Sequence, residues 1–294
     1  MTMYPTKYCM KYYTNLFRVE FETSGVVATW KDCVLARAQA IAEKSSEPIM
    51  VAMSGGIDSE VIARAFKILG IPFRALTVKH LRGTNQHDIQ WADEYCSQHN
   101  IEQIHVELDM PNFFNEGIDS YIEQGYQAVN VYRYFQIWVM EHAKSLGARA
   151  IMGSGEQVYV IHNGQVCVPY TEELLVPQTW AANNQPGAEP LFYLTDDLTS
   201  SWLNIDSIKT ATQNFNLFPK TNPDNTSPFK SGSYKVDAIH QAWPDMIRRP
   251  AYSGYENING IRSEKQSQLR ARFGSRQIQY IPVAQLRRQF KLTV

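Results

Sequence analysis

The residues best suited to chemistry lie between Ser54 and Ser59, where the chain reads Ser-Gly-Gly-Ile-Asp-Ser. If a helix begins there, its first backbone N–H groups have no partner inside the helix and attract anions. Two glycines would let phosphate oxygens approach the backbone closely, and the two serines add hydroxyl donors. Asp58 would repel phosphate, so we expect it to hold a cation such as Mg²⁺ that bridges to phosphate. The stretch therefore predicts a phosphate-binding loop with a metal site.

The flanking residues supply the strand and the helix that this loop needs. Residues 49–53 are a short apolar run, long enough for a buried strand. Residues 60–69 carry apolar side chains at helical spacing. A strand that ends in a glycine turn before a helix would point the N-terminus of that helix at the bound anion.

Strands and helices continue to alternate after this loop. Three further strands are expected, with helices between them: strands at 73–78, 103–108 and 148–152, helices at 85–100 and 113–125, and a third helix that residues 128–133 lead into and that runs to residue 146. The alternation predicts an α/β fold with a doubly wound parallel sheet. Ligands bind beyond the carboxyl ends of the strands in such sheets, and Lys79 and His80 fall at such an end.

The regions on either side of this sheet are less regular. Before it we expect a strand near residues 16–22, packed on the main domain, and a helix over Thr29–Lys44 that Thr29 caps. After it we expect a hairpin around Asn163-Gly164 and a loop or lid over residues 176–190. The rest of the C-terminal region is predicted to be mostly helical.

The composition is that of a soluble globular chain, because the 294 residues are 44% hydrophobic and 19% charged. This length suits one large α/β domain with additional elements, or two domains. No apolar run approaches the ~20 residues that span a bilayer, and the N-terminus lacks the apolar core of a signal peptide. We therefore expect a cytoplasmic protein with no membrane partner.

The cysteines do not form a metal-binding pattern, since none stands in a Cys-x-x-Cys pair. A zinc site or iron–sulfur cluster built from these cysteines alone is not expected. The favoured interpretation is that all four are buried thiols, although one could act as a sulfur carrier: Cys9, Cys33, Cys96 and Cys167.

The net charge of −1 conceals a basic C-terminal tail. Residues 248–291 contain ten lysines or arginines against two acidic residues, so the rest of the chain is acidic. Two arginines beside tyrosines, at residues 248–256, could clamp a phosphate or stack on a base. The tail either binds an anionic partner or docks on the acidic body.

The stretch from Ser54 to Ser59 resembles the signature of the PP-loop ATP pyrophosphatases, a superfamily that includes NAD synthetase, GMP synthetase, asparagine synthetase and several tRNA-modifying enzymes. The resemblance implies a Rossmann-like, HUP-type domain that binds ATP and Mg²⁺. It implies nucleotide contacts from the ends of the first two strands, at Met53 and Val78, which could equally be plain core residues. The loop would contribute the other contacts: Ser54, Gly55, Gly56, Ile57, Asp58 and Ser59.

A second glycine turn follows the strand at 148–152 and strengthens the resemblance. It reads Gly153-Ser154-Gly155-Glu156, and in the family an acid after the corresponding strand helps to bind Mg²⁺. The resemblance implies that Gly153 and Gly155 contact the nucleotide and that Glu156 shares the metal with Asp58. Glu156 could instead be a solvated loop acid.

The remaining catalytic candidates are basic. NAD synthetase has an asparagine and an arginine at the start of the preceding helix, similar to Asn130 and Arg133, and this implies that Arg133 meets phosphate. Arg133 could instead be a surface charge, and Asn130 a helix cap. Lys79 completes the catalytic set with Asp58 and Arg133.

The resemblance implies that an acceptor oxygen attacks the α phosphorus of ATP, that pyrophosphate leaves, and that ammonia or an amine then displaces AMP. Position 2 is Thr2, so a glutaminase of the N-terminal nucleophile type is not expected. The favoured hypothesis is an AMP-forming ligase, similar to an amide synthetase, with a small-molecule acceptor. Two alternatives stay open: an enzyme that modifies a tRNA or DNA base, which the basic tail would bind, and a non-catalytic nucleotide-binding module.

The chain is accordingly divided into three regions. Residues 1–47 form an N-terminal strand and helix extension, and residues 48–170 form the ATP-binding α/β domain. Residues 171–294 form the region that selects the acceptor and ends in the basic tail.

Overall fold

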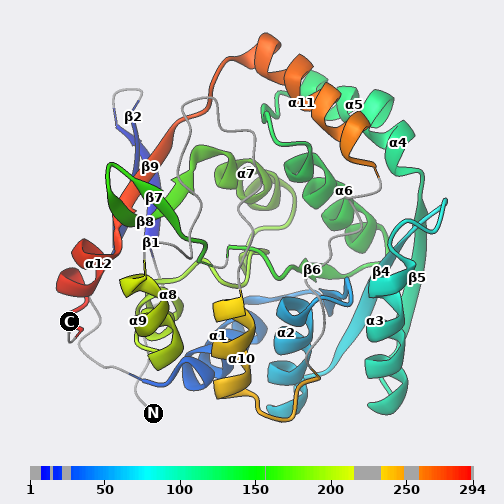
Figure 1. The fold of residues 1–294 in the computed structure, drawn as a ribbon. Coiled ribbons are helices and arrows are strands. Elements are labelled where there is room, and N and C mark those ends of the chain that lie inside the picture. The colour runs from blue at the N-terminus through cyan, green and yellow to red at the C-terminus, as the bar shows by residue number, and fades with distance from the viewer. Residues whose placement is uncertain are drawn as a thin grey trace.

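A four-stranded parallel sheet lies at the centre of the computed structural model (Figure 1). The structure describes residues 8–13, 16–21, 28–155, 157–214, 233–247 and 258–292. The strand order is β5-β4-β3-β6, and the strands are β3 (Ile49–Ala52), β4 (Phe73–His80), β5 (Gln103–Leu108) and β6 (Arg149–Ile151). All four predicted strands are therefore confirmed, and β4 runs two residues further than expected, so that it includes Lys79 and His80.

Helices cover both faces of this sheet, as the prediction of a doubly wound α/β fold requires (Figure 1). One face packs on α1 (Trp30–Lys44), α2 (Ile57–Ile68) and α3 (Gln86–Gln98). The other packs on α6 (Val131–Ser145), α5 (Ile118–Glu123), the short α4 (Met110–Asn112) and a π-helical turn, η1 (Phe113–Gly117). Successive side chains of β3 point to opposite faces. Ile49 and Val51 accordingly join the core on the α1 side, and Met50 joins the core on the α6 side.

Local sequence signals explain where the helices begin. The Thr29 hydroxyl accepts a hydrogen bond from the Asp32 N–H and caps α1, as predicted. The Asn130 side chain accepts one from the Tyr132 N–H at 3.0 Å and caps α6. The cap interpretation of Asn130 is therefore confirmed.

A second sheet has the order β7-β8-β9 and joins the middle of the chain to its C-terminal part: β7 (Val160–His162), β8 (Gln165–Thr171) and β9 (Ile278–Pro282). The hairpin β7–β8 turns at Asn163 and Gly164, whose φ angles are 49° and 72°, which confirms that prediction. The division of the chain at residue 170 stays a prediction. However, β8 crosses this division by one residue and pairs in one sheet with β9, which lies far beyond it.

The N-terminal extension differs from the prediction. It is a hairpin of β1 (Tyr8–Tyr13) and β2 (Leu16–Phe21), and β2 lies against the second sheet rather than the central one. The backbone N–H groups of Phe17 and Val19 donate to the side-chain oxygens of Gln277 and Gln279 at 2.8 and 2.7 Å. The expected strand is present and its side chains Phe17 and Val19 join the core that β3 shares, but it has a second strand beside it and hydrogen-bond partners about 260 positions later in the chain.

The C-terminal region is mostly helical, as predicted: a 3-10 turn, η2 (Glu172–Leu174), then α7 (Leu175–Asn184), α8 (Asp196–Leu203), α9 (Asp206–Gln213), α10 (Ser233–Ala242), α11 (Asn259–Phe273) and α12 (Val283–Gln289). The predicted loop or lid at 176–190 is largely the helix α7. Pro177 falls in its first turn, where proline is tolerated, and Trp180 is buried in the core that α6 shares. No helix within the described ranges is long and apolar enough to cross a membrane.

The described cysteine side chains are buried, as predicted. Cys33, Cys96 and Cys167 are free thiols in the core. Burial raises the pKa of Cys33 and of Cys96 to about 11, which keeps both protonated and unreactive at neutral pH. The side chain of Cys9 lies outside the described part of the chain.

Candidate functional site

The loop between β3 and α2 has the predicted strand–turn–helix form. The last loop residue, Gly56, is the N-cap of α2 and has no side chain, so no N-cap side chain occupies the first backbone N–H groups of the helix. The Ser59 hydroxyl donates to the Gly56 carbonyl at 2.8 Å, and the Gly56 N–H donates to the Ser54 hydroxyl at 3.3 Å. Ser59 is buried and shapes the loop, whereas the exposed Ser54 lies where a ligand can reach it.

Gly55 is the one position of this loop where no other residue fits. Its φ is +87°, and a Cβ added there would lie 1.8 Å from the Asp88 carbonyl oxygen in the first turn of α3. The loop is therefore pressed against α3, and Ile57 begins α2 directly after it.

Replacing Gly55 by alanine is expected to disrupt the loop. The left-handed backbone costs roughly 1–2 kcal/mol for a residue with a Cβ, and the contact with Asp88 adds to it. Gly70→Ala is the matched control. Gly70 also has a positive φ of +65°, but a Cβ added there would meet no other atom within 4 Å. Urea unfolding should show a larger loss of stability for Gly55→Ala than for Gly70→Ala. Titration with an ATP analogue should show weaker nucleotide binding for Gly55→Ala and unchanged binding for Gly70→Ala. Equal losses in both variants would contradict this account of the loop.

Met53 and Val78 lie at the ends of neighbouring strands, as predicted for nucleotide contacts. Their backbone groups also bond within the protein: the Met53 N–H donates to the Leu76 carbonyl at 2.9 Å, and the Val78 carbonyl accepts from the Asn85 side chain at 2.8 Å. Both residues therefore hold the strand ends in place. A nucleotide contact by either stays a prediction.

The second glycine turn lies against the first, as the parallel sheet order requires. A Cβ added to Gly153 would lie 3.1 Å from the Asp58 Cβ and 3.2 Å from the Ser59 backbone nitrogen. Gly155 has φ +95°, and a Cβ there would lie 2.4 Å from the Leu194 side chain. Glu156, the predicted second metal ligand, lies outside the described residues.

Arg133 is connected to the second glycine turn through Gln136. The Arg133 guanidinium donates to the Gln136 side-chain oxygen at 3.0 Å, and the Gln136 amide donates to the Ser154 hydroxyl at 2.8 Å. Gln136 and Ser154 are both buried. Arg133 therefore belongs to the same end of the sheet as Asp58, and its contact with phosphate stays a prediction.

Lys79 and His80 end β4 on the same edge of the sheet. Lys79 is half-buried and stands opposite Glu107 in the β4–β5 register, and its catalytic role stays a prediction. His80 is buried, and its Nδ1 lies 2.6 Å from the Thr84 hydroxyl. Burial lowers the pKa of His80 to about 4, so the imidazole is neutral at pH 7.

The lowered pKa of His80 predicts that acid destabilises the fold. Between its ordinary pKa of about 6.5 and its folded pKa of about 4, the unfolded chain binds a proton that the folded chain does not. Stability should therefore fall as pH is lowered through this window, by roughly 2 kcal/mol between pH 7 and pH 5 from this group. Urea unfolding at both pH values should show a smaller loss for His80→Gln than for the unmodified protein. Equal losses would contradict the assignment.

Sequence reasoning missed Lys235, which approaches Asp58 from α10. Its ammonium nitrogen lies 2.6 Å from Asp58 Oδ2, and the two side chains are only 6% and 22% exposed. Lys235 shares one helix face with Ala238 and Ile239, which are fully buried. A lysine on the apolar face of a predicted helix is the signal that could have identified it.

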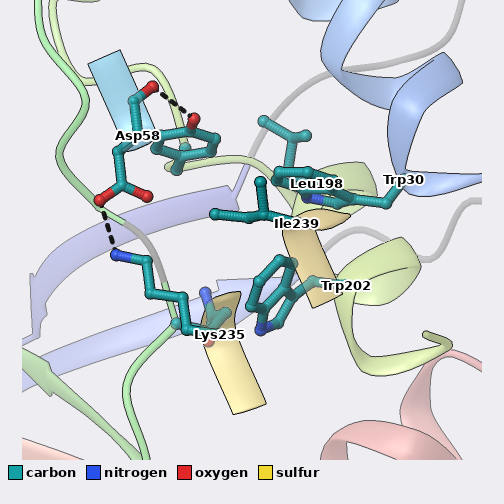
Figure 2. A pocket seen from close by; sticks show the side chains of 8 residues that line it. Trp30, Asp58, Leu198, Trp202, Lys235 and Ile239 are labelled. Atoms are coloured by element: carbon teal, nitrogen blue, oxygen red, sulfur yellow. Dashed lines mark hydrogen bonds and ion pairs between the residues drawn. The ribbon is translucent and has the colours of Figure 1, made fainter. Parts of the chain in front are cut away.

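A small pocket opens beside this ion pair (Figure 2). Asp58 and Lys235 form its polar side, together with Gln157, whose amide is held by Thr199 and Tyr170 at 3.1 Å each. Its apolar lining comes from α1, α8, α10 and the segment before α8: Trp30, Tyr193, Leu198, Trp202 and Ile239. The Tyr193 hydroxyl also donates to the Asp58 carbonyl at 2.9 Å, so the pocket wall is bonded directly to the phosphate-binding loop.

The position of Asp58 suits a cation, since the Lys235 ammonium already lies against its carboxylate. Within the described ranges, no group of three or more His, Cys, Asp or Glu side chains could hold a metal ion. Mg²⁺ does not need such a group, because it is commonly bound by one or two carboxylates together with substrate phosphates. Asp58 therefore fits a magnesium ion that arrives with a phosphate chain.

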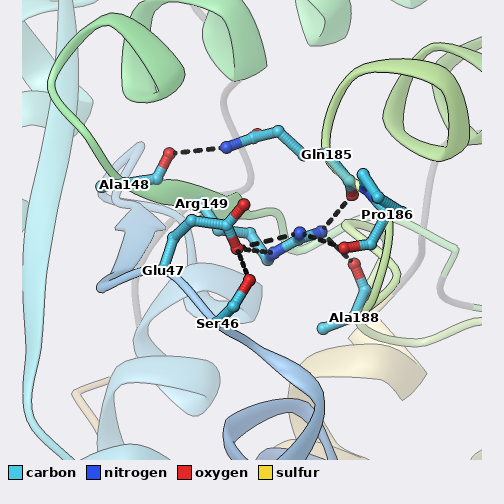
Figure 3. Close-up of polar contacts among 7 residues, drawn as sticks. All are labelled: Ser46, Glu47, Ala148, Arg149, Gln185, Pro186 and Ala188. Carbon is cyan, nitrogen blue, oxygen red and sulfur yellow. Dashed lines mark hydrogen bonds and ion pairs between the residues drawn. The ribbon is translucent and has the colours of Figure 1, made fainter.

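The strand that carries the second glycine turn is anchored at its other end by Arg149 (Figure 3). This buried guanidinium donates to the carbonyls of Gln185, Pro186 and Ala188 at 2.7–2.8 Å. It also forms an ion pair with Glu47 at 3.0 Å. Its Nε also donates to Glu47 at 3.2 Å, so five hydrogen bonds of one side chain join the start of β6 to the segment after α7 and to Glu47, two residues before β3.

A family model described as asparagine synthase matches residues 32–156. No curated protein matches the chain. Two solved structures are similar over most of their length. An NMN synthetase from Francisella tularensis is 14% identical, with 76% of this chain and 100% of that chain covered and a TM-score of 0.34. An NH3-dependent NAD synthetase from Campylobacter jejuni subsp. jejuni NCTC 11168, in complex with nitrate, is 15% identical, with 81% and 95% covered and a TM-score of 0.33.

Proposed function

Because residues 32–156 form a domain of the PP-loop family of ATP pyrophosphatases, we propose that this protein is an AMP-forming ligase that uses Mg²⁺ and ATP to activate a small-molecule acceptor. The observation that supports this most directly is the meeting of three features at Asp58. These are the glycine loop before α2, the second glycine turn at Gly153, and the pocket that Lys235 closes.

The proposed reaction has two steps. An acceptor oxygen forms a bond to the α phosphorus of ATP, and the bond from that phosphorus to the bridging oxygen breaks, so that pyrophosphate leaves. Ammonia or an amine then attacks the activated carbon, AMP leaves, and the nitrogen loses a proton to solvent. No covalent bond to the enzyme is required, because positioning and charge stabilisation supply the catalysis.

The chain's own residues have distinct parts in this proposal. The backbone N–H groups at the start of α2 bind phosphate oxygens, and Gly55 and Gly56 let those oxygens approach. Asp58 would hold Mg²⁺, which supplies positive charge against the developing pyrophosphate. Arg133 would add to that charge. The apolar wall of the pocket keeps water from the activated acceptor.

The basic tail supports a small-molecule acceptor rather than a nucleic acid. Three of its basic side chains contact the body of the protein: Lys265 pairs with Asp119 at 3.1 Å, Arg276 with Glu172 at 3.7 Å, and Arg287 donates to the Leu203 carbonyl at 3.0 Å. These contacts support the interpretation that this part of the tail docks on the body. Residues 248–256, with their arginines and tyrosines, lie outside the described ranges.

Phosphorus NMR of the full chain with ATP, Mg²⁺, ammonium and a fractionated cell extract tests the proposal. AMP and pyrophosphate formed together in one fraction are the expected products, and small-molecule fractions should support the reaction after nuclease treatment. ADP and phosphate would contradict the proposed cleavage site. Tight ATP binding without turnover in any fraction would favour a non-catalytic nucleotide-binding module.

A further inference from the structure

One edge of β4 continues past the end of its neighbour β3. β3 ends at Ala52, opposite Leu76, whereas β4 runs on to His80. The Leu76 carbonyl accepts from the Met53 N–H at 2.9 Å and therefore points towards β3. Backbone groups alternate in direction along a strand, so the Val78 carbonyl and the His80 N–H lie on this same edge. The edge begins where the phosphate-binding loop leaves β3.

The side chain of Asn85 occupies this edge. Its amide nitrogen donates to the Val78 carbonyl at 2.8 Å, and its amide oxygen accepts from the His80 N–H at 3.0 Å. The two partners fix the orientation of the amide, because a carbonyl only accepts and an N–H only donates. A primary amide places a donor beside an acceptor, as the exocyclic amine and the ring nitrogen N1 of adenine do. Asn85 thus fills an edge that is chemically suited to a 6-aminopurine.

Asn85 is also the N-cap residue of α3, yet its side chain does not cap that helix. Asparagine is favoured at an N-cap because its side-chain oxygen accepts from backbone N–H groups of the first turn. Thr29 and Asn130 make such bonds at the starts of their helices. Within α3, which lies wholly in the described ranges, the Asn85 side chain makes no capping bond. Its oxygen therefore has a second position to occupy, turned away from β4 and towards α3.

We propose that Asn85 takes the place of the nucleotide base when the site is empty. When a nucleotide binds with its phosphates on the loop after β3, the base forms the bonds to Val78 and His80, and the Asn85 side chain turns to cap α3. Asn85 therefore competes with the base and lowers the affinity for nucleotide. The inference rests on the proposed function in taking the ligand to be an adenine nucleotide.

The start of α3 also touches the phosphate-binding loop. The Asp88 carbonyl lies against Gly55, and the Asp88 N–H donates to the Asn85 carbonyl at 3.0 Å. A substitution at Asn85 that merely displaced the start of α3 would therefore disturb phosphate binding together with base binding. Competition with the base would change only the binding of a ligand that carries a base.

The test compares a ligand that has a base with one that has none. α,β-methylene-ATP and inorganic tripolyphosphate, each with Mg²⁺, are titrated by calorimetry into the full chain and into Asn85→Ser. Serine can cap α3 but is too short to bridge Val78 and His80. Asn85→Ser should bind α,β-methylene-ATP about fivefold to tenfold more tightly and tripolyphosphate with unchanged affinity. The gain reflects two competing amide bonds, offset by the cap that the Asn85 side chain forms when displaced.

Asn184→Ser is the matched control for this substitution. The Asn184 amide donates to the Trp180 carbonyl at 3.0 Å at the end of α7, so both affinities should stay the same. If Asn85→Ser does not fold, Asn85→Thr takes its place. A second measurement uses the unmodified protein: nuclear Overhauser contacts between the Asn85 amide protons and Val78 should disappear with α,β-methylene-ATP and persist with tripolyphosphate.

Three results would overturn the inference. These are equal or weaker binding of α,β-methylene-ATP by the folded variant, equal tightening of both ligands, and a contact between Asn85 and Val78 that survives the analogue. Absence of AMP formation together with the expected shifts would contradict only the proposed function, because none of these measurements depends on turnover.

Discussion

Asp58→Asn is expected to reduce AMP and pyrophosphate formation by about 10³-fold or more, since it removes the carboxylate that would hold Mg²⁺ against the departing pyrophosphate. The amide keeps the size and shape of the side chain, so Gly153 and Ser59 can pack as before. Initial rates at saturating ATP and Mg²⁺, followed by release of pyrophosphate, give the measurement.

The loss of charge has a second effect that must be separated from the first. Asp58→Asn leaves the Lys235 ammonium without its 2.6 Å partner, and this should also lower the free energy of unfolding. Asp58→Asn/Lys235→Met removes both charges and should regain stability without regaining activity. Asp206→Asn, at an exposed ion pair with Lys209, is the matched control and should change neither property. Activity within tenfold of the unmodified protein in the folded Asp58→Asn variant would refute the metal role of Asp58.

Arg149→Met is expected to cost about 3–5 kcal/mol of unfolding free energy, the largest effect on stability among the substitutions considered. The guanidinium is almost completely buried and satisfies the carbonyls of Gln185, Pro186 and Ala188 as well as Glu47. Methionine fills similar space but leaves these carbonyls without donors in the interior. Urea unfolding followed by tryptophan fluorescence gives the measurement.

The control for Arg149→Met is a second arginine at the start of a strand. Arg74 is the second residue of β4. Its side chain is 28% exposed and forms an ion pair with Glu102 at 3.7 Å. Arg74→Met should cost less than about 1 kcal/mol. Arg149→Lys should recover only part of the loss, because one ammonium cannot reach three carbonyls and a carboxylate at once. Similar losses for Arg74→Met and Arg149→Met would contradict the role given to the Arg149 network.

The central sheet and its phosphate-binding loop could be predicted because their signals are local. The apolar run at 49–53, the two glycines after it and the helical spacing that follows are consecutive in the sequence. The alternation of strands and helices predicted the parallel sheet, and the family resemblance predicted that the second glycine turn lies near Asp58. Thr29 and Asn130 are capping residues whose role depends only on their next few neighbours.

The parts that could not be predicted depend on partners far away in the sequence. The lid expected at 176–190 has the polar, proline-containing composition of a loop, but burial of Trp180 beside α6 makes it a helix. The hairpin of β1 and β2 bonds to Gln277 and Gln279, about 260 positions later in the chain. Lys235 joins the site from 177 residues beyond Asp58, so no spacing rule could have brought the two together.

The pairing of β8 with β9 limits how early the second sheet can form during synthesis. β8 ends at Thr171, and its partner begins only at Ile278. At about 5–20 residues per second, translation needs roughly 5–20 s to reach that partner. Throughout this interval β8 has one unpaired edge, which is the kind of surface that recruits other strands. The central sheet can form early on the ribosome, while the pocket wall that rests on β8 is completed last. A chaperone that covers that edge during synthesis should therefore raise the yield of folded protein.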